Sequence, residues 1–206
     1  MNVFLFKLRN KFTFTKIEEM GEKLISQRLD VSDLPRYSIE EWETWEGKWE
    51  LISGIPYVYH FAPSILHQRI TGKLYKEFYN LTNHVENCEV YLPINFKIDE
   101  HTVLHPDLVI VNDIKEENDL YLTKIPYVIV EILSEKSYKL DTLTKFKIYE
   151  EIGVEYYVVI DPNRKLTEVF QIENKRYKTK YKAENFKFNF TTNIFNINFD
   201  FSKIWK

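Results

Sequence analysis

The apolar residues between positions 64 and 82 recur at helical spacing. The series consists of Leu66, Ile70, Leu74 and Phe78, continued by Leu81. Side chains at this spacing lie on one face of an α-helix, so the pattern predicts a helix over 64–82. A second helix is predicted over 139–153, "KLDTLTKFKIYEEIG", where Gly153 is a typical C-terminal stop. A short helix is expected to begin near Ser38, because Ser38 and Glu41 have capping-box spacing.

Alternating and continuous apolar runs predict strands around these helices. "WELISGIPYVYH" is typical of a hairpin about Ser53-Gly54, and "VYLPINFKI" alternates like a half-buried strand. "VLHPDLVIV" and "PYVIVEIL" are more continuous, as in central strands. "VEYYVVID" predicts a further strand, and "KLTEVFQI", "RYKTKY" and the alternating phenylalanines after position 185 predict β-hairpins. The order of elements indicates one domain of mixed α/β (α+β) class.

Length and composition narrow the choice of protein class. A chain of 206 residues fits one domain, expected over 35–206, with an amphipathic or loose N-terminal extension over 1–34. The net charge of −3 does not indicate a nucleic-acid binder, although a local basic patch can act as one. The single cysteine, Cys88, excludes an internal disulfide. No signal peptide or membrane span is predicted, so we expect a cytoplasmic protein without membrane contact.

Two carboxylates stand in apolar runs that otherwise predict buried strands. Asp107 begins the run "HPDLVIV", and Glu131 lies within "PYVIVEILS". A carboxylate buried alone costs several kcal/mol unless it is protonated, paired or bound to metal. If the two strands are neighbours, both acids can point to one side, where two oxygen ligands suit Mg²⁺ or Mn²⁺. The alternative is that each acid is a satisfied structural group.

The helix predicted over 139–153 brings further polar groups to the same region. Asp141, Lys145 and Tyr149 have spacings of i, i+4 and i+8, which place them on one helix face. An ammonium held near two carboxylates and a metal can orient a water or neutralise a developing oxyanion. Alternatively, Lys145 is a solvated surface charge and Tyr149 packs in the core.

These residues together resemble the Uma-type family of restriction endonucleases, within the PD-(D/E)xK nuclease superfamily. The resemblance extends over residues 38–170. The segments that carry it are "WELISGIPYV", "HQRI", "HPDLVIV", "PYVIVEILS" and "DTLTKFKIYEEIGVEYYVVIDP". It implies a central mixed β-sheet flanked by helices, a restriction-endonuclease-like core with extra β-hairpins, and metal-dependent hydrolysis of phosphodiester bonds.

The resemblance also implies roles for individual residues. Asp107 and Glu131 match the metal ligands, for Mg²⁺ or Mn²⁺. The superfamily's lysine usually lies two residues after the second acid, where this chain has Leu133. Lys145 matches the position to which this lysine has migrated in Uma-like sequences. Tyr149 also fits the family pattern, and Asp141 is a possible accessory residue.

Two more residues match the family but have structural alternatives. Glu50 matches an acid that can complete the metal site, or it pairs with a nearby cation. His67 matches a histidine early in the first long helix, where a structural hydrogen bond is the alternative to metal binding.

The C-terminal hairpins contain a basic stretch. Residues 163–187 carry eight Lys or Arg and three Glu, which is compatible with a ribbon that contacts the DNA backbone. Its candidate DNA-binding residues are Lys175, Arg176, Lys178 and Lys180. The alternative is an exposed hairpin whose lysines prevent edge-to-edge aggregation.

The implied function is a DNA endonuclease that acts as a homodimer, since cutting both strands takes two sites. The alternatives are a catalytically inactive module that binds nucleic acid or a partner, and an enzyme that hydrolyses RNA or a small phosphodiester.

Overall fold

A computed structural model describes residues 34–58, 63–112 and 118–206. The chain divides after Arg36 into two units, and the second, Tyr37–Lys206, contains every element and site residue discussed below. The extension predicted over 1–34 lies, except for its last residue, outside the described residues. None of the described helices is both long enough and apolar enough to span a membrane.

The largest sheet of this unit has six strands in the order β11-β10-β9-β8-β6-β3. β8 and β9 run parallel, whereas the other neighbours are antiparallel, so the sheet is mixed. The strands are β3 (Glu89–Tyr91), β6 (Leu108–Val111), β8 (Val128–Ile132), β9 (Tyr156–Asp161), β10 (Leu166–Glu173) and β11 (Arg176–Ala183).

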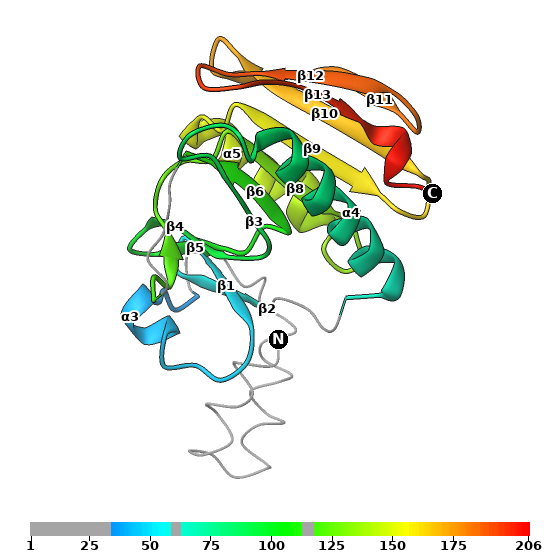
Figure 1. Cartoon of the computed structure of the whole chain (residues 1–206). Coiled ribbons are helices and arrows are strands. Elements are labelled where there is room, and N and C mark those ends of the chain that lie inside the picture. The colour runs from blue at the N-terminus through cyan, green and yellow to red at the C-terminus, as the bar shows by residue number, and fades with distance from the viewer. Residues whose placement is uncertain (1–33, 59–62, 113–117) are drawn as a thin grey trace. The chain divides into compact units, whose positions relative to one another are not determined.

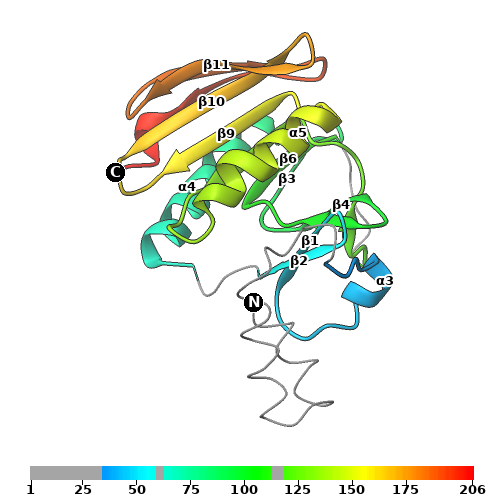
Figure 2. The same cartoon turned by 180° about the vertical axis from the view of Figure 1, so that it is seen from behind.

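Helices cover both faces of this sheet. Helix α4 (Ile65–Thr82) lies in front of the sheet in Figure 1, and α5 (Phe146–Ile152) lies in front when it is seen from behind in Figure 2. Successive side chains of a strand point to opposite faces. In β8, Val128 and Val130 therefore join the core under α4, whereas Ile129 joins the core under α5. The predicted central mixed sheet flanked by helices is confirmed.

Two smaller sheets complete the unit. A five-stranded sheet has the order β2-β1-β5-β4-β7 and carries the short helix α3, and a two-stranded sheet pairs β12 with β13. The remaining elements are α3 (Ile39–Trp42), β1 (Trp49–Ile52), β2 (Ile55–Val58), β4 (Asn95–Asp99), β5 (Thr102–Leu104), β7 (Tyr121–Leu122), β12 (Lys187–Thr191), β13 (Asn196–Asp200) and the 3₁₀-helix η3 (Phe201–Lys203).

Several local predictions are confirmed by the backbone. Ser38 and Glu41 form the expected capping box before α3. β1 and β2 form a hairpin with Ser53 and Gly54 at positive φ (49° and 78°), the geometry of a tight hairpin turn. Helix α4 is capped by Ser64, whose hydroxyl accepts a hydrogen bond from the His67 N–H.

Two predicted strands are each divided between two sheets. "VYLPINFKI" forms β3 and β4, with Pro93 between them, and "VLHPDLVIV" forms β5 and β6, with Pro106 between them. Proline has no N–H to donate to a ladder and restricts the preceding residue. Each proline therefore interrupts an apolar run, and the second interruption places Asp107 where the chain passes from one sheet to the other.

The helix predicted over 139–153 is present but begins with a π-helix. Residues Leu140–Lys145 form the π-helix η2, α5 follows directly, and Gly153 ends it at a φ of 84°. A π-helix is wider than an α-helix and is frequently found at functional sites. Asp141 and Lys145, the first acid and the lysine predicted on this helix, both lie in the π-helical segment.

Candidate active site

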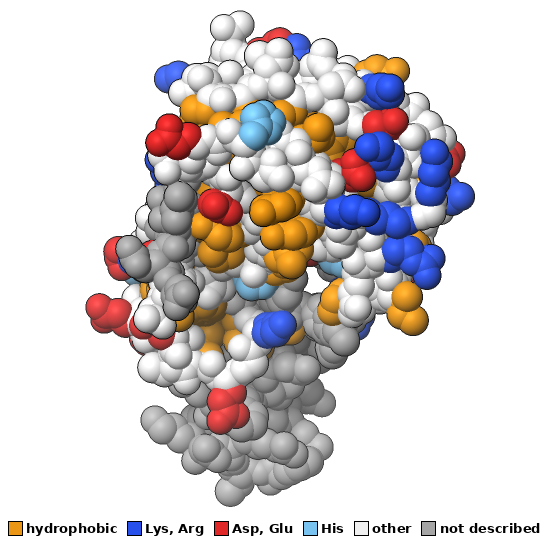
Figure 3. Space-filling view, viewed as in Figure 1, with side chains coloured by type: hydrophobic (Ala, Val, Ile, Leu, Met, Phe, Trp, Pro, Cys, Tyr) orange, Lys and Arg blue, Asp and Glu red, His pale blue; other side chains and the backbone are white. Residues whose placement is uncertain are grey.

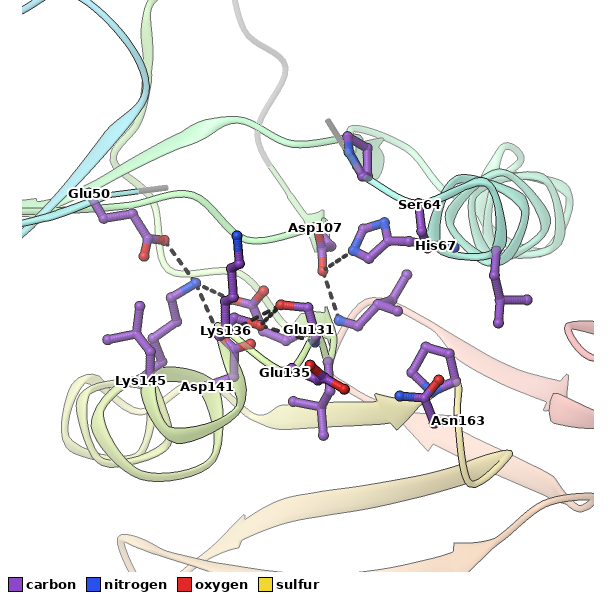
Figure 4. A pocket seen from close by; sticks show the side chains of 18 of the residues that line it. Glu50, Ser64, His67, Asp107, Glu131, Glu135, Lys136, Asp141, Lys145 and Asn163 are labelled. Carbon is purple, nitrogen blue, oxygen red and sulfur yellow. Dashed lines mark hydrogen bonds and ion pairs between the residues drawn. The ribbon is translucent and has the colours of Figure 1, made fainter. Parts of the chain in front are cut away.

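A cavity of about 420 Å³ lies where the two larger sheets meet α4 and η2. Its walls come from β1, the first turn of α4, the start of β6, the end of β8, η2 and the turn after β9. Figure 4 shows the side chains that point into it. All four candidate acids, the candidate lysine and the candidate histidine line this cavity: Glu50, Asp107, Glu131, Asp141, Lys145 and His67.

The ammonium group of Lys145 lies among three carboxylates from three separate elements. Its Nζ is 2.8 Å from Glu50 Oε1, 3.0 Å from Glu131 Oε1 and 3.3 Å from Asp141 Oδ1. The first two contacts have hydrogen-bond distances, whereas Asp141 Oδ1 makes no hydrogen bond and interacts with the lysine only by charge. Since Lys145 is 2% exposed, it is not the solvated surface charge of the alternative interpretation.

Burial and mutual charge set the protonation of this cluster. Burial disfavours the Lys145 ammonium, but Glu131, Glu50 and Asp141 outweigh it and hold the pKa of Lys145 well above its usual range. Burial raises the pKa of Glu131 well above its usual range despite the neighbouring Lys145. Burial likewise raises the pKa of the Asp141 carboxyl. The raised pKa values of Glu131 and Asp141 favour their protonated forms, so the metal-free cluster tends to keep protons on acids beside the charged Lys145.

Tyrosines on the α5 side fix the geometry of this cluster. The Tyr149 hydroxyl donates a hydrogen bond to Glu131 Oε1 at 3.0 Å, the same oxygen that Lys145 contacts. Tyr157, which the sequence did not single out, donates to the backbone carbonyl of Asp141 at 3.0 Å and so holds η2 against the sheet. In the sequence, the polar hydroxyl within the apolar run "VEYYVVID" was the only signal for Tyr157.

Asp107 enters the cavity from the neighbouring strand. β6 and β8 pair antiparallel, with Leu108 opposite Val130, which confirms that the strands carrying the two acids are neighbours. Asp107 Oδ2 accepts hydrogen bonds from the Ile132 N–H at 2.8 Å and from His67 Nε2 at 3.2 Å. The Asp107 carboxyl group is thus held between the C-terminal end of β8 and helix α4.

The His67 ring links Asp107 to α4. Its Nδ1 lies 3.3 Å from Thr71 Oγ1, and its Nε2 faces Asp107. Burial lowers the pKa of His67, but the hydrogen bond and the charge of Asp107 outweigh burial and raise it overall. With an accepting carboxylate on one side, His67 positions Asp107 and is oriented by Thr71.

Glu50 is held by the backbone as well as by Lys145. Glu50 Oε1 accepts a hydrogen bond from the His105 N–H at 2.8 Å. This contact ties β1 to the segment that leads into Asp107. Glu50 therefore pairs with a nearby cation, which was the alternative to a role as metal ligand, and this cation is Lys145.

The candidate DNA-binding residues of the C-terminal hairpin do not line the cavity. Lys175 and Arg176 lie at the turn between β10 and β11, and Lys178 and Lys180 follow along β11, whereas Asn163 of the cavity lies near the opposite end of β10. The eight residues of β10 separate these ends by about 25 Å at 3.3 Å per residue. Arg176 bonds Glu150 of α5 at 2.8 Å, and Lys180 pairs with Glu173. A DNA-binding role for this hairpin stays a prediction.

Glu150 links this hairpin to the helix that follows Lys145. Glu150 accepts hydrogen bonds from the Tyr177 N–H at 2.6 Å and from Arg176 at 2.8 Å. The Tyr177 N–H, more than Arg176, lowers the pKa of Glu150. The contacts that lower this pKa stabilise the folded protein at pH values above 4.5, the pKa of Glu150 in the unfolded chain. This stabilisation is lost as the pH falls through the pKa of Glu150 in the folded protein.

We expect Glu150→Ala to lower the free energy of unfolding by about 1–3 kcal/mol at pH 7, because it leaves a buried N–H without an acceptor. The difference from wild type should shrink as the pH falls through the folded pKa, which lies below 4.5, since the wild-type carboxyl is then protonated. Urea unfolding at pH 7 and at a series of pH values below 4.5 measures the effect. Glu151→Ala, at the exposed neighbouring position, is the matched control and should change stability by less than about 0.5 kcal/mol. Equal losses in both variants would contradict the assigned role of Glu150.

The donors in the cavity fit a Mg²⁺ or Mn²⁺ site of the open kind. The hydrogen bonds described above use only Oδ2 of Asp107 and Oε1 of Glu131, and no described residue bonds the other oxygen of either carboxylate. Within the described ranges, no three His, Cys, Asp or Glu side chains are grouped to hold a metal ion by themselves. Mg²⁺ needs no such cage, because it binds through one or two carboxylates and keeps several waters.

Comparison with solved structures defines the class of the fold. The chain is similar to a structure from Anabaena variabilis ATCC 29413, described as "a putative nuclease belonging to DUF820", with a TM-score of 0.58 and 16% sequence identity. The match covers 69% of this chain and 83% of the other. The mixed sheet with α4 and α5 is therefore a restriction-endonuclease-like fold.

A family comparison gives the closer assignment. Residues 36–189 match the Uma2 family, described as "Putative restriction endonuclease". The match spans most of the unit that holds the cavity, and the chain belongs to this family. The resemblance inferred from the sequence is thereby confirmed. No curated protein matches the chain significantly.

Proposed function

We propose that this protein is a metal-dependent endonuclease that hydrolyses phosphodiester bonds of DNA at the cavity described above. One observation carries the proposal: Asp107 and Glu131, from adjacent strands, line one cavity together with Lys145, whose ammonium lies 3.0 Å from Glu131. Membership of the Uma2 family and the fold shared with the Anabaena variabilis structure described as "a putative nuclease" support it.

The excess of acids supports a divalent cation at this site. Five carboxylates line the cavity, together with two lysines and one histidine: Glu50, Asp107, Glu131, Glu135, Asp141, Lys136, Lys145 and His67. Asp107 and Glu131 would hold the Mg²⁺ or Mn²⁺, and Glu50 is a candidate third ligand only if it releases Lys145. A bound cation of this type lowers the pKa of a coordinated water and offsets charge on the phosphate.

The residues of the chain would share the remaining tasks. Lys145 is placed to orient the attacking water beside Glu131 or to stabilise charge that develops on the phosphate. Tyr149 holds Glu131 at the oxygen that Lys145 also contacts. His67 holds Asp107 in place from α4. Asp141 and Glu50 keep Lys145 charged and fix its position.

Metal binding and cleavage of supercoiled plasmid DNA test the proposal. Wild-type protein is expected to cut the plasmid with Mg²⁺ or Mn²⁺ but not with EDTA, and calorimetry should detect Mn²⁺ binding. Asp107→Ala should lower cleavage by at least about 100-fold and weaken Mn²⁺ binding by about 10- to 100-fold. Asp99→Ala, at an exposed position of β4, is the control. Cleavage by Asp107→Ala at the wild-type rate would refute the assigned site.

A second candidate is a module that binds nucleic acid or a partner without cutting. The favouring observation is that Lys145 is already satisfied by three carboxylates, as a purely structural cluster would be. Such a module need not bind Mn²⁺ at Asp107 and Glu131, so the same calorimetry separates the two candidates.

As an endonuclease that cuts duplex DNA, the protein would act as a homodimer with one cavity for each strand, which light scattering of the purified protein tests.

A further inference from the structure

The outward face of helix α4 carries an uninterrupted set of basic side chains. Arg69, Lys73 and Lys76 are spaced at i, i+4 and i+7, and they point away from the buried side of the helix that holds Ile70 and Leu74. Arg69 and Lys76 are exposed, and Lys73 is partly exposed. Figure 3 shows Lys and Arg side chains gathered over α4, with the surface hollowed beside them. We call Arg69, Lys73 and Lys76 the α4 basic stripe.

The charge of the α4 basic stripe is not offset by any acid among the described residues. None of its three residues makes an ion pair or hydrogen bond through its side chain with any described residue. The helix contains one acid, Glu77, and this acid is paired with Lys203 at 2.6 Å. The candidate ribbon differs, because its Arg176 and Lys180 are paired with Glu150 and Glu173.

The same helix also forms part of the cavity. Ser64 and His67, in its first turn, line the cavity, and His67 contacts Asp107. Arg69 follows two residues later. At about 100° per residue, Arg69 lies about 200° around the helix from His67, so the stripe is on the far side of α4 from the cavity lining. Only a ligand wide enough to pass across the N-terminal end of α4, as a nucleic-acid duplex is, would contact both.

Gly72 lies within the stripe and has no structural need to be glycine. A Cβ atom at this position would meet nothing within 4 Å, and its φ is not positive. Glycine inside a helix costs about 1 kcal/mol relative to alanine. Glycine is one of the residues used where a backbone must approach a ligand closely, and the open space at Gly72 leaves room for a partner at this face.

We infer that the α4 basic stripe binds the phosphate backbone of the nucleic acid cut in the cavity. From Arg69 to Lys76 the helix rises about 10 Å, close to three base-pair steps of 3.4 Å. The stripe thus contacts up to three phosphates and carries no base specificity. The inference rests on the proposed function for the choice of ligand.

A charge-matched pair of triple variants tests this inference. One variant carries Arg69→Gln, Lys73→Gln and Lys76→Gln, and the other carries Lys175→Gln, Lys178→Gln and Lys180→Gln on the hairpin. Binding to a fluorescent 30-base-pair duplex is measured in EDTA at several salt concentrations, so that no cleavage is needed. The α4 variant should bind at least about 10-fold more weakly in low salt, and its slope of log affinity against log salt should be smaller by about 2 to 3.

The hairpin variant should retain affinity within about threefold of wild type. Equal losses in both variants would show an effect of net charge alone and would overturn the inference, as would a loss confined to the hairpin variant or no loss in either. Circular dichroism confirms that both variants fold. Binding is measured without metal and therefore does not depend on catalysis. If only the nuclease proposal is wrong, the wild type still binds the duplex in EDTA but does not cut plasmid DNA with Mg²⁺ or Mn²⁺.

Discussion

Lys145→Met is expected to abolish DNA cleavage while it strengthens the binding of Mn²⁺. Methionine has nearly the length of lysine without its charge. The ammonium competes with a cation for Glu131 Oε1, and its charge opposes a second positive ion among the same acids. Without it, Mn²⁺ affinity should rise several-fold, whereas cleavage should fall by about 100- to 1,000-fold because the group proposed to orient the water or stabilise the transition state is gone.

The measurement combines calorimetry with plasmid cleavage, and thermal unfolding provides a readout independent of activity. Removing the lysine leaves three buried acids without their partner, so the metal-free variant should be less stable than wild type. Added Mn²⁺ should then raise its Tm by more than it raises the wild-type Tm. Lys147→Met, at an exposed position of α5, is the matched control. Cleavage within threefold of wild type would remove Lys145 from the mechanism.

Glu131→Gln is expected to inactivate the protein and yet stabilise its metal-free form. Burial raises the pKa of Glu131 well above its usual range, so its ionised form is costly in the folded protein. Glutamine keeps the shape without the charge, and Lys145 retains Glu50 and Asp141 as partners. We expect Mn²⁺ binding and cleavage to be lost, and the free energy of unfolding in EDTA to rise by about 1 kcal/mol at pH 7.

The pH dependence gives this prediction its sign. The Glu131 carboxyl has a pKa of 4.5 in the unfolded chain and a higher pKa in the folded protein. The stability of the wild type therefore falls as the pH rises from 4.5 toward the folded pKa. The advantage of Glu131→Gln should therefore grow with pH above about 4.5. Urea unfolding at pH 4.5 and pH 7 in EDTA measures it. Glu135→Gln, an exposed neighbour, should show no such trend, and a variant less stable than wild type at pH 7 would contradict the assigned cost.

Much of the sheet and the identity of the cavity residues could be predicted from the sequence. A carboxylate inside an apolar strand needs a partner, and this need indicated that Asp107 and Glu131 could share a site if their strands were neighbours, as β6 and β8 are. Lys145 could be predicted to be buried because apolar residues share its helix face. These inferences used only local patterns and the cost of burying charge.

Other features depend on contacts distant in sequence and could not be predicted. The π-helical geometry of Leu140–Lys145 has no clear signature in hydrophobic spacing over so few residues, since its hydrogen bonds span only one residue more than those of an α-helix. The assignment of β4 and β5 to a second sheet follows from pairing with β1, which no single segment encodes. Arg176 belonged to a basic run in the sequence, but its nearest partner, Glu150, lies 26 residues away.

The contact between Asp107 and Ile132 has a consequence for how this family can lose activity. In the β6–β8 ladder the residue opposite Ile132 is Pro106, and the Ile132 N–H bonds the Asp107 carboxylate instead. The Asp107 carboxylate therefore supplies the last hydrogen-bond acceptor between β6 and β8. A lineage that no longer needs hydrolysis would still be selected to keep this aspartate for folding. A relative can therefore keep this aspartate only for the pairing of β6 with β8. Under the proposed function, loss of Glu131 or Lys145 is the better indication that such a relative no longer cleaves nucleic acid.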